Sequence, residues 1–286
     1  MTRHDNRKEN SAVYKNTGRD GNCGKAGGPP LIEFSSVTVY RNNRKVLSSV
    51  SAVIGRGENV AILGPNGAGK SSFIRTITRE YYPVAGENVV FRINGSDVWD
   101  VFALRSSLGI VSNDLQAVFY RDISGRETIL SGFFSSVGLY NREVTGAMEE
   151  KADSIAAFLD ITLLQHRKMN EMSSGEARRF LIGRALVHDP ATLILDEPTN
   201  SLDLHALHAF RTVLRKIACA GTGIILVTHN LHDIIPEISR VILMKEGEFW
   251  RDGPKDDILT GGQISDLFGL PVTVRKEGGY YYATGY

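Results

Sequence analysis

The segment at residues 64–71 constrains the fold of this chain more than any other feature. It matches G-x-x-x-x-G-K-[ST] at every fixed position, because it consists of Gly64, Pro65, Asn66, Gly67, Ala68, Gly69, Lys70 and Ser71. A short apolar run precedes it, and residues 71–79 predict a helix with one apolar face. Glycines let the backbone N–H groups of such a loop converge on phosphate oxygens, and the helix N-terminus adds positive potential. A glycine-rich turn could match by chance, but the order strand, glycine loop, helix favours a nucleotide-phosphate site.

Two motifs supply the side chains that ATP and Mg²⁺ require. We expect Lys70 to reach the β- and γ-phosphates, Ser71 to ligate Mg²⁺, and Ser72 to join the phosphate contacts. An apolar run at 193–195 ends in Asp196 and Glu197, at the edge of the sheet where α/β proteins place ligand groups. Asp196 is expected to hold the metal through a water, and Glu197 to polarise the attacking water. An apolar run that ends in Asp-Glu is common, so this interpretation depends on its pairing with the glycine loop.

Short apolar runs alternate with helical patterns along the chain. The strands are predicted at 59–63, 192–195 and 223–227, and the helices at 71–79, 149–159, 176–187 and 204–218. This alternation predicts an α/β fold with the core of a P-loop NTPase, RecA-like and with a mostly parallel sheet. Strands at 32–39 and 46–54 predict an antiparallel β subdomain, and the helical character of about 113–178 predicts an inserted α-helical subdomain.

The same patterns divide the chain into three parts. Residues 1–30 hold almost no large apolar side chains, which predicts a disordered tail. Residues 31–262 form the predicted main domain. Residues 263–286 form a C-terminal extension, in which two short strands around Gly278 predict a β-hairpin.

Composition excludes some classes of function. A formal net charge of +1 over 286 residues disfavours a general nucleic-acid or membrane-surface binder. Cys23 and Cys219 lie far apart and predict neither a disulfide framework nor a metal cluster, which favours a reducing cytosol. The sequence has no signal-like start and no run that approaches the roughly 20 apolar residues of a membrane span. We therefore expect a cytoplasmic protein that reaches a membrane only through a partner.

Three further motifs carry a family resemblance. Residues 172–176, Met-Ser-Ser-Gly-Glu, resemble the signature motif of ATP-binding-cassette (ABC) ATPases, usually Leu-Ser-Gly-Gly-Gln. Residues 197–203, Glu-Pro-Thr-Asn-Ser-Leu-Asp, resemble that family's approach to the D-loop, and Thr228-His229-Asn230 resembles its switch histidine. With the two motifs above, five motifs follow in the family's order, and the resemblance covers about residues 31–262.

The resemblance implies a site that two chains share. In this family two cassettes stack head to tail, so Ser173 and Gly175 are expected to face the γ-phosphate of ATP bound to the other cassette. Tyr40 matches the aromatic residue that stacks on adenine; the alternative is a strand-edge ring packed on the core. His229 is expected to contact the γ-phosphate, and a buried structural histidine is the alternative.

Two departures from the family pattern change what the resemblance implies. Ser174 stands where glycine is usual and Glu176 where glutamine is usual, so activation across the dimer could be altered. Family members often have a catalytic and metal-contacting glutamine after the strand at 108–112; this chain has Asn113 there, and glutamine follows only at Gln116. We favour Gln116 because Asn113 is one methylene shorter.

Two classes of function fit the motifs. The first is the ATPase subunit of an ABC transporter, expected to be a homodimer that drives separate integral membrane permease subunits. The second is a soluble cassette that acts on nucleic acid, ribosomes or a protein complex, and a single cassette favours the first. Aromatic residues at 116–140 suit a groove for an apolar permease helix or, alternatively, the core of the helical subdomain. The C-terminal extension weakly resembles importer ATPases for metal chelates and oxyanions.

Overall fold

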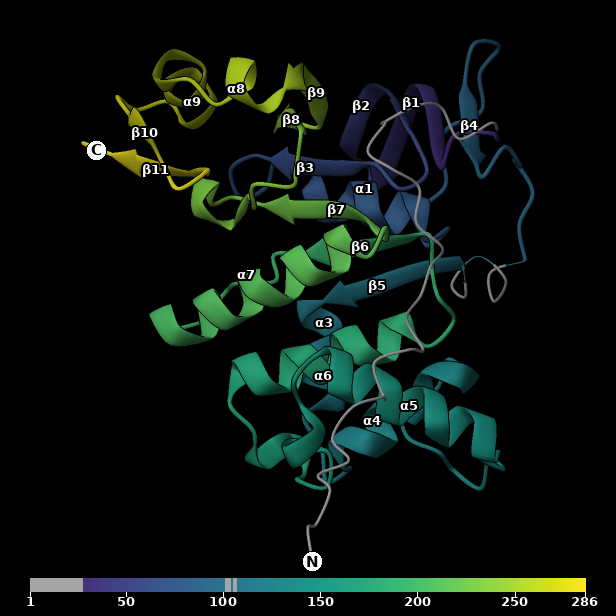
Figure 1. The fold of residues 1–286 in the computed structure, drawn as a ribbon. Coiled ribbons are helices and arrows are strands. Elements are labelled where there is room, and N and C mark those ends of the chain that lie inside the picture. The colour runs from purple at the N-terminus through teal and green to yellow at the C-terminus, as the bar shows by residue number, and fades with distance from the viewer. Residues whose placement is uncertain (1–27, 101–103, 105–106) are drawn as a thin grey trace, which may run out of the picture.

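The computed structural model describes residues 28–100, 104 and 107–286 (Figure 1). Of the predicted disordered tail, residues 1–27 therefore lie outside the described part, as does Cys23.

A six-stranded sheet forms the centre of the molecule. Its order is β5 (Leu108–Ser112), β6 (Thr192–Asp196), β7 (Gly223–Thr228), β3 (Asn59–Leu63), β8 (Arg240–Lys245) and β9 (Glu248–Pro254). All neighbouring pairs are parallel except β8 with β9. The inner strands are apolar on both faces, as strands covered on both sides must be. The predicted α/β fold with a mostly parallel sheet is confirmed.

A smaller antiparallel sheet covers one side of this core. Its order is β2 (Arg44–Ile54), β1 (Ile32–Arg41), β4 (Val90–Ile93). Helix α1 (Lys70–Ile77) lies between the two sheets and buries Phe73, Ile74 and Ile77. The ring of Phe73 meets that of Phe34 on β1 edge to face, with centroids 5.7 Å apart. The small sheet thus holds α1 against the large one and fixes the direction in which the N-terminus of α1 points.

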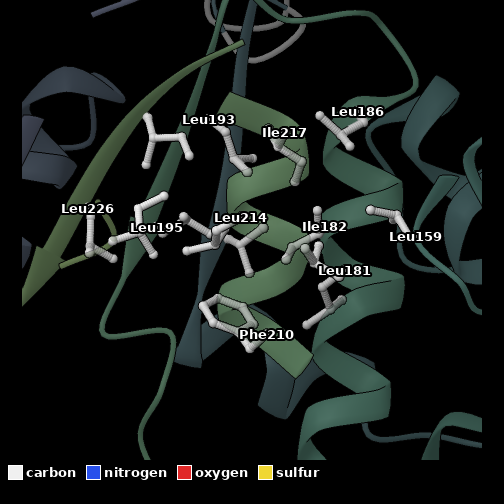
Figure 2. Close-up of a cluster of buried hydrophobic side chains, with 14 of the residues drawn as sticks. Leu159, Leu181, Ile182, Leu186, Leu193, Leu195, Phe210, Leu214, Ile217 and Leu226 are labelled. Atoms are coloured by element: carbon white, nitrogen blue, oxygen red, sulfur yellow. The ribbon is translucent and has the colours of Figure 1, made fainter. Parts of the chain in front are cut away.

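The helical subdomain is inserted between β5 and β6, on the opposite side of the molecule (Figure 1). It contains α3 (Asn113–Phe119), α4 (Gly125–Ser131), α5 (Gly146–Phe158) and α6 (Ser174–Leu186), linked in part by short 3₁₀ turns. Helix α7 (Leu204–Cys219) lies between the sheet and α6. Figure 2 shows how Phe210, Leu214 and Ile217 of α7 fill this interface.

The chain ends in two short helices and a hairpin. They are α8 (Lys255–Ile258), α9 (Gly261–Phe268), β10 (Thr273–Glu277) and β11 (Tyr280–Thr284). The two strands pair antiparallel around Gly278 and Gly279, both with positive φ, so the predicted strand pair around these glycines is present.

We expect Phe210→Ala to lower the free energy of unfolding by about 3–5 kcal/mol, because it opens a cavity in a close-packed interface. Phe210 is only 1% exposed and lies among leucines and isoleucines of β6, α6 and α7 (Figure 2). The measurement is urea-induced unfolding. Leu204→Ala changes an exposed side chain on the same helix and should cost less than about 0.5 kcal/mol. A similar loss in both variants would contradict this account of the core.

Candidate nucleotide site

The glycine loop joins β3 to α1 with almost no free space on its inner side. A Cβ at Gly64 would lie 2.2 Å from the carbonyl oxygen of Met244 on β8, so only glycine fits there. Gly69 has φ +105°, a conformation that side chains disfavour, and it precedes α1 without any side-chain cap. The first N–H groups of α1 are therefore left to a ligand, and the helix dipole makes an anion the preferred one.

Lys70 lies deep in this loop, with only 4% of its surface exposed. Its Nζ donates to the carbonyl oxygens of Gly64 (2.9 Å) and Pro65 (3.0 Å) and lies 3.2 Å from Oε1 of Glu197. The ammonium is thus held beneath the loop by backbone acceptors and one carboxylate. It can be shared with a phosphate without first being desolvated.

Asp196, the last residue of β6, has the character of a metal ligand. One strand, β7, separates β6 from β3, which leads into the glycine loop, and a hydrogen bond links Asp196 to Ser71. Burial raises the pKa of Asp196, and its buried Oδ1 has no hydrogen-bond partner. A buried, unpaired carboxylate oxygen beside a hydroxyl matches the hard oxygen ligands that Mg²⁺ prefers. The residues present fit the metal.

Glu197 is held in place from several sides. Its backbone has φ +49°, and its N–H donates to the carbonyl oxygen of Val227 on β7 (2.8 Å). Its Oε2 accepts from Nδ2 of Asn200 (2.8 Å), and its Oε1 lies 3.3 Å from Nδ1 of His229. Burial acts to raise the pKa of Glu197, but the hydrogen bond from Asn200 and the charge of Lys70 outweigh it, so the pKa lies below its ordinary value. The carboxylate stays ionised near neutral pH and can act as a base or polarise water.

A cavity of about 570 Å³ opens over Lys70, Ser71 and Glu197. It is lined mainly by the glycine loop, the turn before β9 and the start of β2, including Asn66, Gly67, Gly69, Lys70, Ser71, Ser72, Glu197, Lys45 and Glu246. Tyr40 does not line this cavity. It is paired on the neighbouring strand with Lys45, which does line it. Tyr40 is 53% exposed, so it is not buried in the core, and its contact with adenine stays a prediction.

The signature residues lie away from this cavity. Ser173 and Gly175 line a separate hollow of about 120 Å³ at the start of α6, together with residues of α7. Ser173 caps α6, and its hydroxyl and backbone N–H both donate to Oε2 of Glu176 (2.9 and 2.8 Å). Gly175 is buried, and a Cβ there would lie 2.8 Å from that of Ala206 on α7. Close packing of α6 against α7 therefore also favours glycine at position 175, which the sequence alone did not indicate.

Gln116 lies on α3 and its side chain has a protein partner. Its Oε1 accepts from Nε (3.1 Å) and Nη2 (2.5 Å) of Arg178 on α6. The backbone of Ser112, just before α3, pairs with that of Asp196, so residue 113 follows directly beside the end of β6.

The sequence did not identify Arg178 and Asn200 as site residues. In the sequence, Arg178 is distinguished only as the second residue after the signature motif. No spacing rule predicts that it reaches Gln116.

The aromatic residues at 116–140 divide into two groups. Phe119 is fully buried, so the expectation of an aromatic groove is wrong for this residue. Phe133 and Phe134 are half-buried, and Phe133 also packs against the core. Tyr120 and Tyr140 are 63% and 72% exposed. These two tyrosines therefore offer the most exposed aromatic surface of the five residues.

Comparison with known proteins supports the nucleotide-binding role that the geometry of the site indicates. A family model described as "ABC transporter" matches residues 47–200, more than half of the 286. The uncharacterized ABC transporter ATP-binding protein YlmA of Bacillus subtilis is 32% identical over 85% of this chain and 93% of its own length. The hemin import ATP-binding protein HmuV of Escherichia coli O157:H7 is 29% identical over 86% of this chain and 95% of its own length.

Solved structures share the fold. A putative metal-chelate type ABC transporter in an inward-facing conformation matches with a TM-score of 0.71 at 19% identity, covering 89% of this chain and 96% of its own. A dimeric ATP-binding cassette in a post-hydrolysis state with ADP and Pi matches with a TM-score of 0.63 at 24% identity, covering 78% and 98%. With its glycine loop, acidic strand end, signature segment and switch histidine in one fold, the chain belongs to the ATP-binding proteins of the ABC transporter family.

Proposed function

We propose that this protein binds ATP with Mg²⁺, hydrolyses it to ADP and phosphate, and does so as a head-to-tail dimer that drives separate membrane permease subunits. The observation that carries the proposal is that Lys70 and Glu197 line one cavity and that His229 lies against the Glu197 carboxylate. Lys70 and Glu197 are 3.2 Å apart, and Glu197 and His229 are 3.3 Å apart. A cation for phosphate, an ionised carboxylate for water and a second polar group at the same place are what phosphoryl transfer to water needs.

Each residue has a distinct role in the proposed reaction. The N–H groups of the glycine loop and the Lys70 ammonium bind the phosphates, with Ser72 among the contacts and Tyr40 against the adenine ring. Ser71 and Asp196, with Gln116 as a further contact, would hold Mg²⁺, which neutralises charge on the phosphate oxygens when bound. Glu197 orients and polarises the attacking water, and His229 donates to the γ-phosphate.

Two observations support a second copy as part of the site. Ser173 and Gly175 line a hollow apart from the Lys70 cavity, so within one chain they do not complete it. An ATP-binding cassette with a similar fold has been solved as a dimer with ADP and Pi bound. In such a dimer the Ser173 hydroxyl and the N-terminus of α6 would face the nucleotide of the other chain.

The proposal of membrane permease partners rests on the relatives and on the surface of the helical subdomain. The relative HmuV is named as a hemin import ATP-binding protein. In the described part of this chain, no helix combines the length and apolar character needed to cross a bilayer. Exposed Tyr120 and Tyr140 offer aromatic surface to a partner helix. We propose that the protein acts in the cytoplasm, held on the inner face of the cell membrane by its permease partner. A cassette acting on nucleic acid or ribosomes is the alternative, and co-purification with ribosomes instead of a polytopic membrane protein would favour it.

The dimer is tested by light scattering with Glu197→Gln, a change that should slow hydrolysis and preserve the ATP-bound state. We expect the mass to double on addition of Mg²⁺ and ATP, and not with ADP. A further Ser173→Arg change places a bulky cation at an exposed signature position and should prevent doubling while ATP still binds. Leu163→Arg, at another exposed position of the helical subdomain, should leave the doubling intact. A mass that stays monomeric in saturating ATP would contradict the proposal.

A further inference from the structure

Arg178 is a buried cation that the roles above do not use. It lies in the first turns of α6, is 4% exposed, and burial lowers its pKa to about 10, so it remains charged at neutral pH. A buried guanidinium is costly unless its donors are well paired. Four hydrogen bonds join Arg178 to oxygen acceptors in two different segments of the chain.

The first segment is α3 and the second is the loop that follows Glu197. From α3, Oε1 of Gln116 accepts from Nε and Nη2, as described above. From the loop, the carbonyl oxygens of Pro198 and Asn200 both accept from Nη1, the latter at 3.3 Å. The planar fork of arginine suits such a junction, because it fixes several acceptors in one plane.

The loop contacts bear directly on Glu197. Pro198 is its neighbour in the chain, and Asn200 uses Nδ2 to hold Oε2 of Glu197 at 2.8 Å. Asn200 therefore joins the two groups: its carbonyl oxygen binds Arg178 and its amide binds the carboxylate. Glu197 itself has φ +49°, which a residue with a side chain adopts only when its surroundings enforce it.

We propose that Arg178 is a positioning residue for Glu197: it fixes the backbone of residues 198–200 and, through Asn200, the direction of the Glu197 carboxylate. The inference rests on the proposed role of Glu197 in hydrolysis. It adds a second role for α6. The helix that presents Ser173 at its N-terminus also carries the guanidinium that orders the hydrolytic carboxylate of the same chain.

The test is a double-mutant cycle of Arg178→Met and Glu197→Gln, read as steady-state ATP turnover and as equilibrium ATP affinity. Methionine keeps the length and apolar packing of the side chain and removes its donors. Alone, Arg178→Met should lower kcat about 10- to 100-fold and change ATP affinity less than about twofold, because the phosphate-binding loop is untouched. In the Glu197→Gln background it should lower the residual kcat by less than about twofold, since the group that it positions is already disabled.

Two controls separate positioning from folding. Arg184→Met changes another arginine of α6, which bonds to the carbonyl oxygen of Ser136, and should leave kcat within about twofold. If Arg178→Met has no cooperative unfolding transition, Arg178→Lys replaces it; lysine keeps the charge without the fork, and we expect a smaller kcat loss with the same non-additivity.

The outcomes are distinct. An unchanged kcat in Arg178→Met, or losses that multiply in the double variant, would overturn the inference while the role of Glu197 stands. Wild-type turnover in Glu197→Gln alone would instead overturn the proposed function.

Discussion

Replacing Lys70 with methionine is expected to weaken ATP binding at least about 100-fold and to abolish detectable turnover, because the substitution removes the buried cation that lies under the phosphate loop. Lys70 is almost fully buried and is held by the carbonyl oxygens of Gly64 and Pro65. Its ammonium is therefore already desolvated and held in a fixed position. After the substitution, water cannot take over its role of binding phosphate. Titration with a fluorescent ATP analogue and a phosphate-release assay measure the two effects.

The charge of Lys70 also acts on Glu197. Removing it takes away one of the neighbours that lower the pKa of this carboxylate, so the pKa of Glu197 should rise. Lys45→Met is the matched control, because Lys45 lines the same cavity from the exposed start of β2. It should change ATP affinity less than about threefold, as expected for a solvated charge. Equal losses in the two variants would mean that general positive charge, and not the buried ammonium, binds the phosphates.

The phosphate loop could be predicted from the sequence because its function depends mainly on the backbone. The spacing of Gly64, Gly69 and Lys70 fixes where the chain turns and where the helix begins, and the flanking apolar runs fix the strand and the helix. The same holds for Asp196, the last residue of β6, and for His229, which follows β7, because these two buried strands lie side by side in the sheet. Parallel strands bring their carboxyl ends to one edge, so motifs far apart in sequence meet there.

What the sequence could not predict depends on the direction and packing of side chains. Gly175 was assigned to the nucleotide, but it also lies against Ala206 on α7, a contact set by how two helices cross. Phe119 and Tyr120 are neighbours in the chain, and one is buried while the other is exposed. The link from Arg178 to Gln116 and the loop at 198–200 joins three segments whose relative positions only the packed fold defines. No local pattern carries that information.

Glu197→Gln is expected to lower ATP turnover by about 1,000-fold while leaving ATP affinity unchanged or higher, because it removes a charge and keeps the shape of the side chain. Glutamine can still accept from Asn200 through its amide oxygen, so the loop at 198–200 should stay in place. It cannot polarise water as a carboxylate does. It also removes a negative charge that lies 3.2 Å from the phosphate-binding Lys70, which favours a bound anion.

The control is Glu246→Gln, which neutralises an exposed carboxylate on the rim of the same cavity. Its turnover should stay within about twofold of wild type, since the side chain lies outside the cluster of Lys70, Glu197 and His229. Single-turnover measurements with ATP in the presence of Mg²⁺ separate the chemical step from product release. If Glu197→Gln slows only product release, or if it weakens ATP binding as much as Lys70→Met does, then Glu197 serves the binding of nucleotide and another group must activate the water. The low pKa and the restrained geometry of Glu197 favour the first result, because an ionised carboxylate held by Asn200 is ready to act on water without rearrangement.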